Sequence, residues 1–530
     1  MVLIVALLAM VLTMAMMPPL AQVAHRAGLL AHPAARKVHE GAIPQIGGVA
    51  ITVCAVVGAS WLMPPLPMFV ALLVGGGMLF ALGLYDDWRE LGHQGKFVVE
   101  FAAAAIAMAI ARIATIDLGA PFGVLASWLS VPVALLFLVG MSNAVNFTDG
   151  LDGLAGGLAL LTCLALALCG YQLDNELAVV VPLVIAGGVV GFLRFNTHPA
   201  RIFMGNAGAY FLGFALGFTA LSLCVEGGGE SLVTVAMLLG VPFIDAAFLP
   251  VYRYTHGRPL FPSDRSHLHH RFLEAGFSHR SAVALIYSLH SALVLAGYAL
   301  RSAPGVLRAV VFAVLATLIE SAPWSLAPLR RALKPRIVEL KPSAWLGRGL
   351  WLAAFVAMLS ATLVAIASTP AITMDFVVCA VLALAIVVAW QWMRRDSELS
   401  WPARCWLYVL GAYTVYFQAQ SAAGAQAQPL WSVVAFGAVG LFLVYRLAAG
   451  SGRAFALTPL DLLVVVATAT VAYLGRQAFE LSTIDVVKLV IWFYAVELLA
   501  DDRERGNWLR GLTYCGFGMI AARGAMELLL

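Results

Sequence analysis

Charged residues are scarce in this chain. Asp, Glu, Lys and Arg together make up 11% of the 530 residues, whereas apolar residues make up 62%. An ordinary soluble domain is about 25% charged and about 45–50% apolar. The few charges here cannot shield so much apolar surface from water, and the composition therefore excludes an ordinary soluble domain. It predicts a chain that is mostly surrounded by lipid.

Paired cysteines and a basic leader are lacking too. The seven cysteines lie in or beside apolar runs and none belongs to a CxxC pair, so the sequence predicts neither a disulfide framework nor a zinc site. The apolar run over residues 1–20 has no basic residues before it, and a second apolar segment soon follows. We therefore expect this run to be a retained transmembrane helix and not a cleaved signal peptide.

Apolar segments of spanning length recur along the whole chain. Their number predicts an all-α, polytopic transmembrane helix bundle with about eighteen transmembrane helices. If the N-terminus lies outside, most of the 32 basic residues fall in the inside loops. This asymmetry follows the positive-inside rule and supports the proposed orientation.

The polar residues divide the chain into two zones. Up to about residue 300 the inside loops are dense in Asp, Asn, His and Gly, whereas the loops after the basic stretch 330–348 hold no comparable clusters. We therefore predict a first membrane domain over residues 1–340 and an additional transmembrane domain over residues 341–530. The second domain could dock a partner, form a homodimer or carry a second activity.

The first two polar clusters bring basic and acidic groups to the inside face. RKVHEGAIPQIGG holds Lys37 and His39 before a Pro turn and a glycine pair, which suits the binding of an anion by backbone N–H groups. GLYDDWRELGHQGK holds the adjacent carboxylates of Asp86 and Asp87 at the end of an apolar helix. Two such charges repel each other unless a cation or Lys96 neutralises them.

The third cluster, NAVNFTDGLDGLAGG, has a polar residue at every third position. These residues are Asn143, Asn146, Asp149 and Asp152, a spacing that suits one face of a helical turn. Carboxylate and amide oxygens are the hard ligands that Mg²⁺ or Mn²⁺ prefers. The stretch predicts a metal-bound phosphate site.

The fourth cluster, RFNTHPARIFMGNAG, supplies Asn196, His198, Arg201 and Asn206 just before another membrane helix. Its polar side chains surround a proline and two glycines. The position on the inside face places it with the first three clusters.

The fifth cluster, GRPLFPSDRSHLHHRF, holds Arg265, His267, His269 and His270 in the longest inside loop. The histidines could form a zinc site. However, no cysteine accompanies them and the neighbouring arginines would repel a cation, so a diphosphate or nucleotide partner fits better.

These motifs, in this order, resemble the polyprenyl-phosphate N-acetylhexosaminyl-1-phosphate transferases. The matching stretches are HEGAIPQIGG, the Asp86–Asp87 pair, NAVNFTDGLDGLAGG, FNTHPARIFMGN and DRSHLHHRF, and they cover roughly residues 1 to 320. The resemblance implies transfer of a sugar-1-phosphate from a UDP-sugar to undecaprenyl phosphate with release of UMP. It also implies a bacterial inner-membrane enzyme with a cytosolic site, and we expect no nucleic-acid partner.

The clusters and the resemblance together assign the site residues. The expected catalytic residues are Asp86, Asp87, Asp149 and Asp152. The expected ligands of Mg²⁺ or Mn²⁺ are Asp86, Asp149 and Asn206. The residues expected to bind the substrates are Lys37, His39, Lys96, Asn143, Asn146, Asn196, Arg265, His267, His269 and His270.

One position departs from the pattern of the family. Most members carry an aspartate in the F-M-G-D stretch where this chain has Asn206, and that aspartate is assigned to the metal. An amide brings a carbonyl oxygen but no charge, so the cation should be held less firmly. Another carboxylate could take over, the metal dependence could differ, or the activity could be reduced.

Two further questions stay open. DRSHLHHRF resembles the branch that uses UDP-N-acetylhexosamines and not the peptidoglycan branch, which makes UDP-GlcNAc or a close relative the first expectation. A membrane transporter or lipid flippase is the alternative function, since the predicted helix count suits it. Transporters place ionisable residues near the midplane, however, whereas these clusters lie at helix ends.

Overall fold

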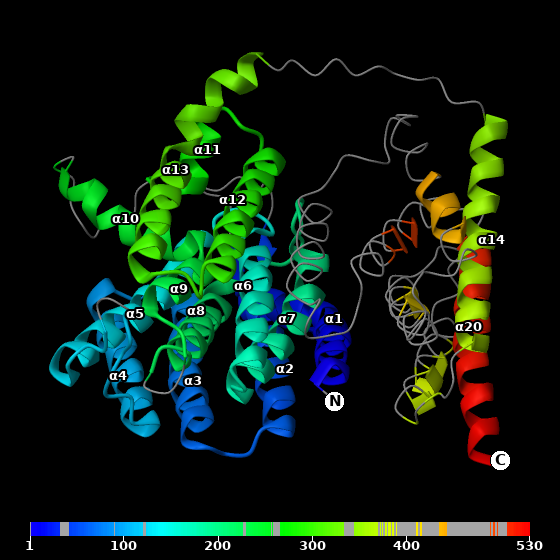
Figure 1. Ribbon diagram of the computed structural model, residues 1–530, viewed down its shortest axis with the longest axis horizontal. Coiled ribbons are helices and arrows are strands. Elements are labelled where there is room, and N and C mark those ends of the chain that lie inside the picture. Colours follow the sequence, from blue (N-terminus) through cyan, green and yellow to red (C-terminus); the bar gives the residue numbers. More distant parts are fainter. Residues whose placement is uncertain are drawn as a thin grey trace. The chain divides into compact units, whose positions relative to one another are not determined.

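The computed structural model describes residues 2–31, 42–89, 91–119, 123–225, 229–255, 257, 266–332, 344–368 and 506–529, and scattered residues between 372 and 496 (Figure 1). It divides into two compact units. The first holds Met1–Lys334 with Thr458–Thr470, and the second holds the remainder. The predicted division of function between residues 1–340 and 341–530 stays a prediction.

Helices make up most of the described part of the first unit. They are α1 (Val2–Ala27), α2 (Gly47–Leu62), α3 (Pro67–Trp88), α4 (His93–Ala111), α5 (Ser127–Thr148), α6 (Leu154–Gln172), α7 (Glu176–Asn196), α8 (Gly205–Ser222), α9 (Leu232–Leu239), α10 (Val241–Thr255), α11 (Leu268–Glu274), α12 (His279–Ala299) and α13 (Gly305–Ala332). Two short antiparallel strands, β1 (Leu30–Ala31) and β2 (Ile43–Pro44), pair with each other.

A mostly helical, multi-pass architecture is confirmed, with one short pair of strands, but the count of about eighteen transmembrane helices is not supported. Among the described residues, nine helices are long and apolar enough to cross a membrane, or ten if α9 and α10 form one bent span. One reason is length, because α2 has only 16 residues where a span needs roughly 20. Most of residues 369–505, where several further spans were predicted, lie outside the described residues.

The break between α9 and α10 has a local cause. The two helices meet at Gly240 with a bend of 103°. Gly240 has a φ of +67°, and a Cβ there would lie 2.3 Å from Nδ1 of His290. Any other residue would be strained by the positive φ, and its Cβ would clash with the ring of His290. Glycine is therefore required at this bend.

Helix α8 lies in the middle of the first unit, and nearly all of its residues are buried (Figure 1). Glycines let other backbones reach it. A Cβ on Gly48 would lie 2.2 Å from Cα of Gly208, and a Cβ on Gly83 would lie 2.5 Å from Cα of Ala207. This close contact brings the start of α2 and the end of α3 against the start of α8. The described end of the first polar cluster therefore meets the second and the fourth clusters at one place.

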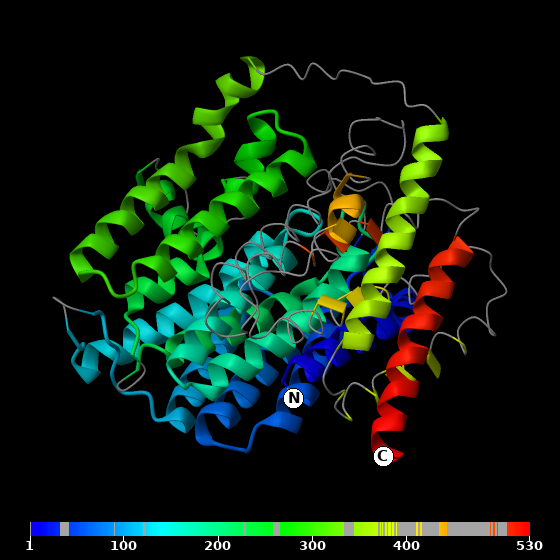
Figure 2. The same cartoon turned by 45° about the vertical axis from the view of Figure 1, so that its right-hand side comes forward.

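The remaining helices α10 to α13 gather at one side of the first unit (Figure 2). Helix α10 also packs on α5, where the rings of Phe137 and Phe243 are 5.9 Å apart. This arrangement brings the fifth polar cluster, on α11, toward the loop that follows α5.

In the second unit, the described residues include α14 (Ala344–Ser368) and α20 (Gly506–Leu529), which pack against each other. A separate apolar core surrounds them, with Trp492 fully buried and its indole N–H bonded to the carbonyl of Leu407 at 2.9 Å.

Candidate functional site

The acidic pair lies at the end of α3, where α3 meets the start of α8. Asp86 is only 6% exposed. Its Oδ2 lies 2.7 Å from Nζ of Lys96 and accepts a hydrogen bond from Nδ2 of Asn206 at 2.8 Å, while its Oδ1 accepts one from the backbone N–H of Leu91 at 2.9 Å. A buried carboxylate is tolerated only when it is paired and hydrogen-bonded, and Asp86 has both kinds of partner.

Asp87 lies against the first turn of α8. Its two oxygens accept hydrogen bonds from the backbone N–H groups of Asn206, at 2.9 Å, and Ala207, at 3.1 Å. These donors have no partner within their own helix, and a carboxylate also interacts favourably with the positive end of the helix dipole. Gly205, with a φ of +79°, turns the chain into α8 beside this carboxylate.

An amide relay connects the third cluster to the acidic pair. Nδ2 of Asn146 donates to Oδ1 of Asn206 at 2.8 Å, and Nδ2 of Asn206 donates in turn to Asp86. One helical turn earlier on α5, Nδ2 of Asn143 donates to Oε2 of Glu100 at 2.6 Å. The side chains of α3, α4, α5 and α8 thus form adjoining parts of one polar site.

Asp149 follows the last residue of α5. Burial, reinforced by the negative charges of Asp87 and Asp152, raises the pKa of Asp149 from 3.8 to about 7. Without a cation, the carboxyl group therefore keeps its proton to a higher pH than a free aspartate does.

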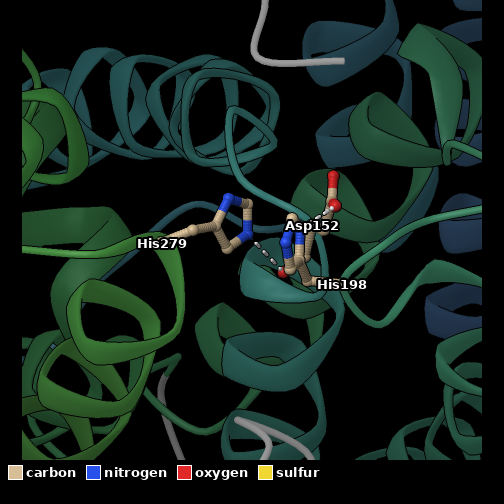
Figure 3. A group of neighbouring side chains, drawn as sticks. All are labelled: Asp152, His198 and His279. Atoms are coloured by element: carbon tan, nitrogen blue, oxygen red, sulfur yellow. Dashed lines mark hydrogen bonds and ion pairs between the residues drawn. The ribbon is translucent and has the colours of Figure 1, made fainter. Parts of the chain in front are cut away.

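Asp152 takes part in a different contact (Figure 3). Its Oδ2 lies 2.7 Å from Nδ1 of His198 and accepts the backbone N–H of Ala200 at 3.1 Å, while Nε2 of His279 lies 3.4 Å from its backbone carbonyl. Residues from three separate stretches of the chain are joined here. The contacts hold the loop after α5 to the loop before α8 and to the start of α12.

Asp152, His198 and His279 could in principle hold a metal ion, because one ligand atom from each lies within 4.8 Å of the others. The two imidazole rings are stacked, however, with centroids 4.3 Å apart and an angle of 25° between the planes. A metal bound to an imidazole nitrogen lies near the plane of that ring, and two stacked planes do not share such a point. The arrangement suits an ion pair that braces the loops.

Asn196 also supports the loop after α5. It is 2% exposed, its Oδ1 accepts the backbone N–H of Gly153 at 2.9 Å, and its Nδ2 donates to the carbonyl of Ile202 at 3.0 Å. The hydroxyl of Tyr287 donates to the carbonyl of Gly153 at 2.6 Å. Both ends of the Asn196 amide are used by backbone groups, so its place in the structure is that of a support for the loop.

The three histidines lie on or next to the short helix α11. Nδ1 of His267 lies 2.9 Å from Oδ2 of Asp245, whose Oδ1 accepts the backbone N–H of Leu268 at 2.9 Å. The His267 ring also lies 5.0 Å from the ring of Phe147 in the third cluster. Asp245 thus fixes both the imidazole and the first turn of α11 beside the loop after α5.

His269 faces Gly150 in that loop. A Cβ on Gly150 would lie 2.2 Å from Nε2 of His269, so glycine is required for this approach. Burial, with the neighbouring His270, lowers the pKa of His269 to about 3, and the ring is neutral at physiological pH. The rings of His269 and His270 lie 4.2 Å apart.

The structure brings together most of the predicted site residues that it describes. Asp86, Asp87, Lys96, Asn146 and Asn206 form one bonded network, with Asn143 and Asp149 on the same helix or directly after it. The histidines contact the loop after α5, whereas Asp152 and Asn196 brace it. Lys37, His39 and Arg265 lie outside the described residues.

Glu100, Asp245 and His279 also contact the site, although none of them belongs to the five polar clusters. Glu100 is 1% exposed and lies one helical turn after Lys96, and Asp245 is nearly as deeply buried on α10. Glu100 and Asp245 are ionisable residues in apolar stretches, which is the signal that could have found them, because such residues are rare in membrane spans. His279 stands beside Arg280 at the start of α12 and carries no such signal.

Oxygen-bearing side chains are concentrated in this region. Asp86 and Asp87 bond the amide and the backbone N–H of Asn206, Asp149 is near enough to Asp87 to be affected by its charge, and the ammonium of Lys96 is paired with Asp86. Burial is the main cause of the raised pKa of Asp149, and the negative charges of Asp87 and Asp152 add to it. Mg²⁺ or Mn²⁺ prefers such oxygen ligands, and Asp86, Asp149 and Asn206 are the residues expected to hold it.

Comparison with known proteins agrees with these motifs. The profile of glycosyl transferase family 4 matches residues 69–224. The probable undecaprenyl-phosphate N-acetylglucosaminyl 1-phosphate transferase of Bacillus subtilis is 33% identical over 308 residues, covering 57% of this chain and 85% of the relative. A decaprenyl-phosphate N-acetylglucosaminephosphotransferase of Mycobacterium tuberculosis is 33% identical over 320 residues, covering 53% and 78%.

The similarity extends to the peptidoglycan branch. A phospho-N-acetylmuramoyl-pentapeptide-transferase of Moorella thermoacetica is 34% identical over 282 residues, covering 48% of this chain and 83% of the relative. The aligned stretches therefore account for about half of the chain. The matching motifs, and an alignment that covers 85% of the Bacillus subtilis relative, show the family. This multi-pass membrane protein belongs to glycosyl transferase family 4, among the polyprenyl-phosphate N-acetylhexosaminyl-1-phosphate transferases.

Proposed function

We propose that this protein transfers a sugar-1-phosphate, an N-acetylhexosamine-1-phosphate in particular, from a UDP-sugar to undecaprenyl phosphate. An oxygen of the lipid phosphate forms a bond with the sugar-bearing phosphorus, the phosphoanhydride bond breaks, and UMP leaves. The reaction would be the first membrane step of cell-surface polysaccharide synthesis. The basic residues of the loops favour a site on the cytosolic side of a bacterial inner membrane.

The observation that carries the proposal is the bonded network of Asp86, Lys96, Asn146 and Asn206. It joins three polar clusters from distant stretches of the chain. Both reactants are anionic, so an enzyme for this reaction has to neutralise charge and align an in-line attack. A cluster of carboxylates beside one ammonium suits that task when a cation is bound. Mg²⁺ or Mn²⁺ at this cluster would neutralise the diphosphate of the donor.

The protein's own residues have distinct parts in this proposal. Lys96, which is paired with Asp86 in this network, would orient the phosphates. Asp87 fixes the first turn of α8 and with it the amide of Asn206. The neutral ring of His269 and the ring of His270 would contact the sugar nucleotide beside Gly150.

The acceptor needs little help from a general base. The second pKa of a phosphate monoester is about 6, so the lipid phosphate is mostly dianionic at neutral pH. We therefore assign the carboxylates to cation binding and charge placement and do not require any of them to remove a proton.

The test is transfer by the purified full-length protein. Undecaprenyl phosphate, Mg²⁺ and one of UDP-GlcNAc, UDP-GalNAc or UDP-MurNAc-pentapeptide are incubated with it, and UMP and the lipid product are followed. We expect equal amounts of both products with an N-acetylhexosamine donor and loss of both in Asp86→Asn. Glu176→Gln, an exposed residue at the other end of the bundle, is the matched control.

Two outcomes would reject the proposal. UMP release without a lipid-linked sugar would indicate hydrolysis. No release from any donor, combined with movement of lipid across vesicles that contain the protein, would favour a flippase.

A further inference from the structure

Four buried charged or polar side chains connect α13 to the histidine cluster. Glu320 on α13 forms an ion pair with Arg271 on α11, and Nη1 of Arg271 also donates to the backbone carbonyl of Glu320 at 2.8 Å. Nη2 of Arg271 lies 3.6 Å from Oδ1 of Asp245, which in turn holds His267. The chain of contacts therefore runs from α13 through α11 to α10.

This ion pair is unlike a surface salt bridge. Arg271 and Glu320 are each 5% exposed. The guanidinium of Arg271 lies 5.5 Å from the ring centre of Phe248 and 5.1 Å from that of Trp324, so aromatic rings cover it. Without the charge of Glu320, the buried guanidinium would keep only the more distant carboxylate of Asp245, at 3.6 Å, so Arg271 would have to move. The pair thus fixes the place of α11 relative to α13.

Helix α11 needs such anchors because it has only seven residues. A helix this short is not stable by itself in water and depends on its tertiary contacts. Asp245 holds its first turn and Glu320 holds Arg271 in its last turn. Between these two anchors lie His269, packed against Gly150, and His270.

We propose that Glu320, through Arg271, is a positioning residue that holds α11 and its histidines against the loop after α5. Among the described interactions, Glu320 makes no contact with the network around Asp86 and Asn206. It lies on α13, outside the five polar clusters. The inference that α11 is held there to receive the sugar nucleotide rests on the proposed function.

The surroundings of Glu320 allow a clean test. Its Oε2 bonds Arg271, whereas Oε1 has no hydrogen-bond partner among the described residues. Glu320 also lines a cavity of about 420 Å³ between α10 and α13, so small changes of this side chain need not cause a clash. Glu320→Gln keeps the shape and one acceptor but removes the charge, and Glu320→Asp keeps the charge on a shorter side chain.

The first experiment needs no substrate. Full-length protein is treated with diethyl pyrocarbonate, which modifies neutral imidazoles, and the labelling rate of His269 is followed by mass spectrometry. His269 is 3% exposed in the wild type, so it should label slowly. We expect labelling at least about fivefold faster in Glu320→Gln because α11 opens locally, a smaller increase in Glu320→Asp, and the wild-type rate in Glu176→Gln.

The second experiment measures transfer by the same proteins. A positioning role predicts a rise of about tenfold in KM for the nucleotide donor in Glu320→Gln, with a smaller change in kcat and in KM for the lipid. The double variant Arg271→Met with Glu320→Met removes both buried charges. If the pair only stabilised the fold, this variant would regain the wild-type labelling rate and donor KM; we expect both to stay altered.

A wild-type labelling rate of His269, or an unchanged donor KM, in a folded Glu320→Gln protein overturns the proposal. If the wild-type protein transfers no sugar phosphate, the proposed function fails. The labelling rates still decide in that case whether Glu320 positions α11.

Discussion

The two halves of the candidate site are held in different ways. The carboxylate half lies where three long helices meet, and its side chains bond one another and the backbone at the start of α8. The histidine half lies on a seven-residue helix whose anchors, Asp245 and Glu320, come from α10 and α13. The first half is fixed by the packing of the bundle, whereas the second depends on a few buried polar contacts.

This difference matters for a reaction of two anionic substrates. Under the proposed function, a cation site has to keep its ligands in place while no cation is bound, and the packed helices would supply that rigidity. The half that is proposed to bind the nucleotide can tolerate some local opening. We therefore expect substitutions in the carboxylate half to reduce turnover and substitutions in the histidine half to weaken donor binding.

After the loss of transfer expected in Asp86→Asn, the largest effect is expected at Asp87. Asp87→Ala removes the acceptor of two backbone N–H groups in the first turn of α8 and displaces Asn206. The lost cap should cost about 1 kcal/mol of stability. Activity should fall by roughly 100-fold or more, as when a preorganised polar group is lost from an active site. Thermal unfolding and kcat measure the two effects.

Asp174→Asn is the matched control for Asp87→Ala, since Asp174 is an exposed carboxylate in the loop before α7. Its φ of 51° suits asparagine as well as aspartate. Near-normal turnover in a folded Asp87→Ala protein would mean that the start of α8 does not shape the site.

The contrast between the halves also explains what could be predicted from sequence. Asp86, Asp87, Asn146 and Asn206 belong to dense polar clusters in an apolar chain, and membrane helices place such clusters at functional sites. Their convergence depends on close approaches such as that of Gly48 to Gly208, which the sequence does not reveal without the fold.

The anchors of the histidine half could not be predicted in that way. Glu320 and Arg271 are 49 positions apart, and no periodicity connects them. Asn196 has a structural part that the sequence did not indicate: the resemblance implies substrate binding, which stays a prediction, and the structure shows that its amide supports the backbone of Gly153 and Ile202. Residue type indicated where polar groups are concentrated. Which of these side chains support the backbone could be learned only from the structure.

A second substitution tests how closely α11 must approach the loop after α5. Gly150→Ala places a Cβ 2.2 Å from Nε2 of the buried His269, so α11 and the loop after α5 must separate. We expect KM for the nucleotide donor to rise roughly tenfold or more, with a smaller loss of kcat. Gly77→Ala is the control, because a Cβ at Gly77 has no atom within 4 Å. Unchanged kinetics in Gly150→Ala would show that this contact is not needed.

A smaller effect is expected from Asn206→Asp. Without a cation, the new carboxylate would face Asp86 in place of an amide donor, so the melting temperature should fall. With Mg²⁺ the extra charge should lower the concentration needed for half-maximal activity by about tenfold, since ligand charge sets affinity for hard cations. Asn175→Asp is the control, because aspartate caps the start of α7 equally well. If Mg²⁺ affinity does not change, position 206 is not a metal ligand in this chain.

The smallest effect concerns Asp149 and pH. Its pKa is raised from 3.8 to about 7, so in the cation-free protein the folded state keeps a proton that the unfolded state has lost. Stability should therefore fall as the pH rises from about 4 through about 7. Mg²⁺ displaces this proton, so the increase in melting temperature on adding Mg²⁺ should be greater at pH 8 than at pH 6. In Asp149→Asn the two increases should be nearly equal. A pH-independent increase in the wild type would place the cation away from Asp149, and the carboxylate half would then have to bind it through Asp86 and Asp87 alone.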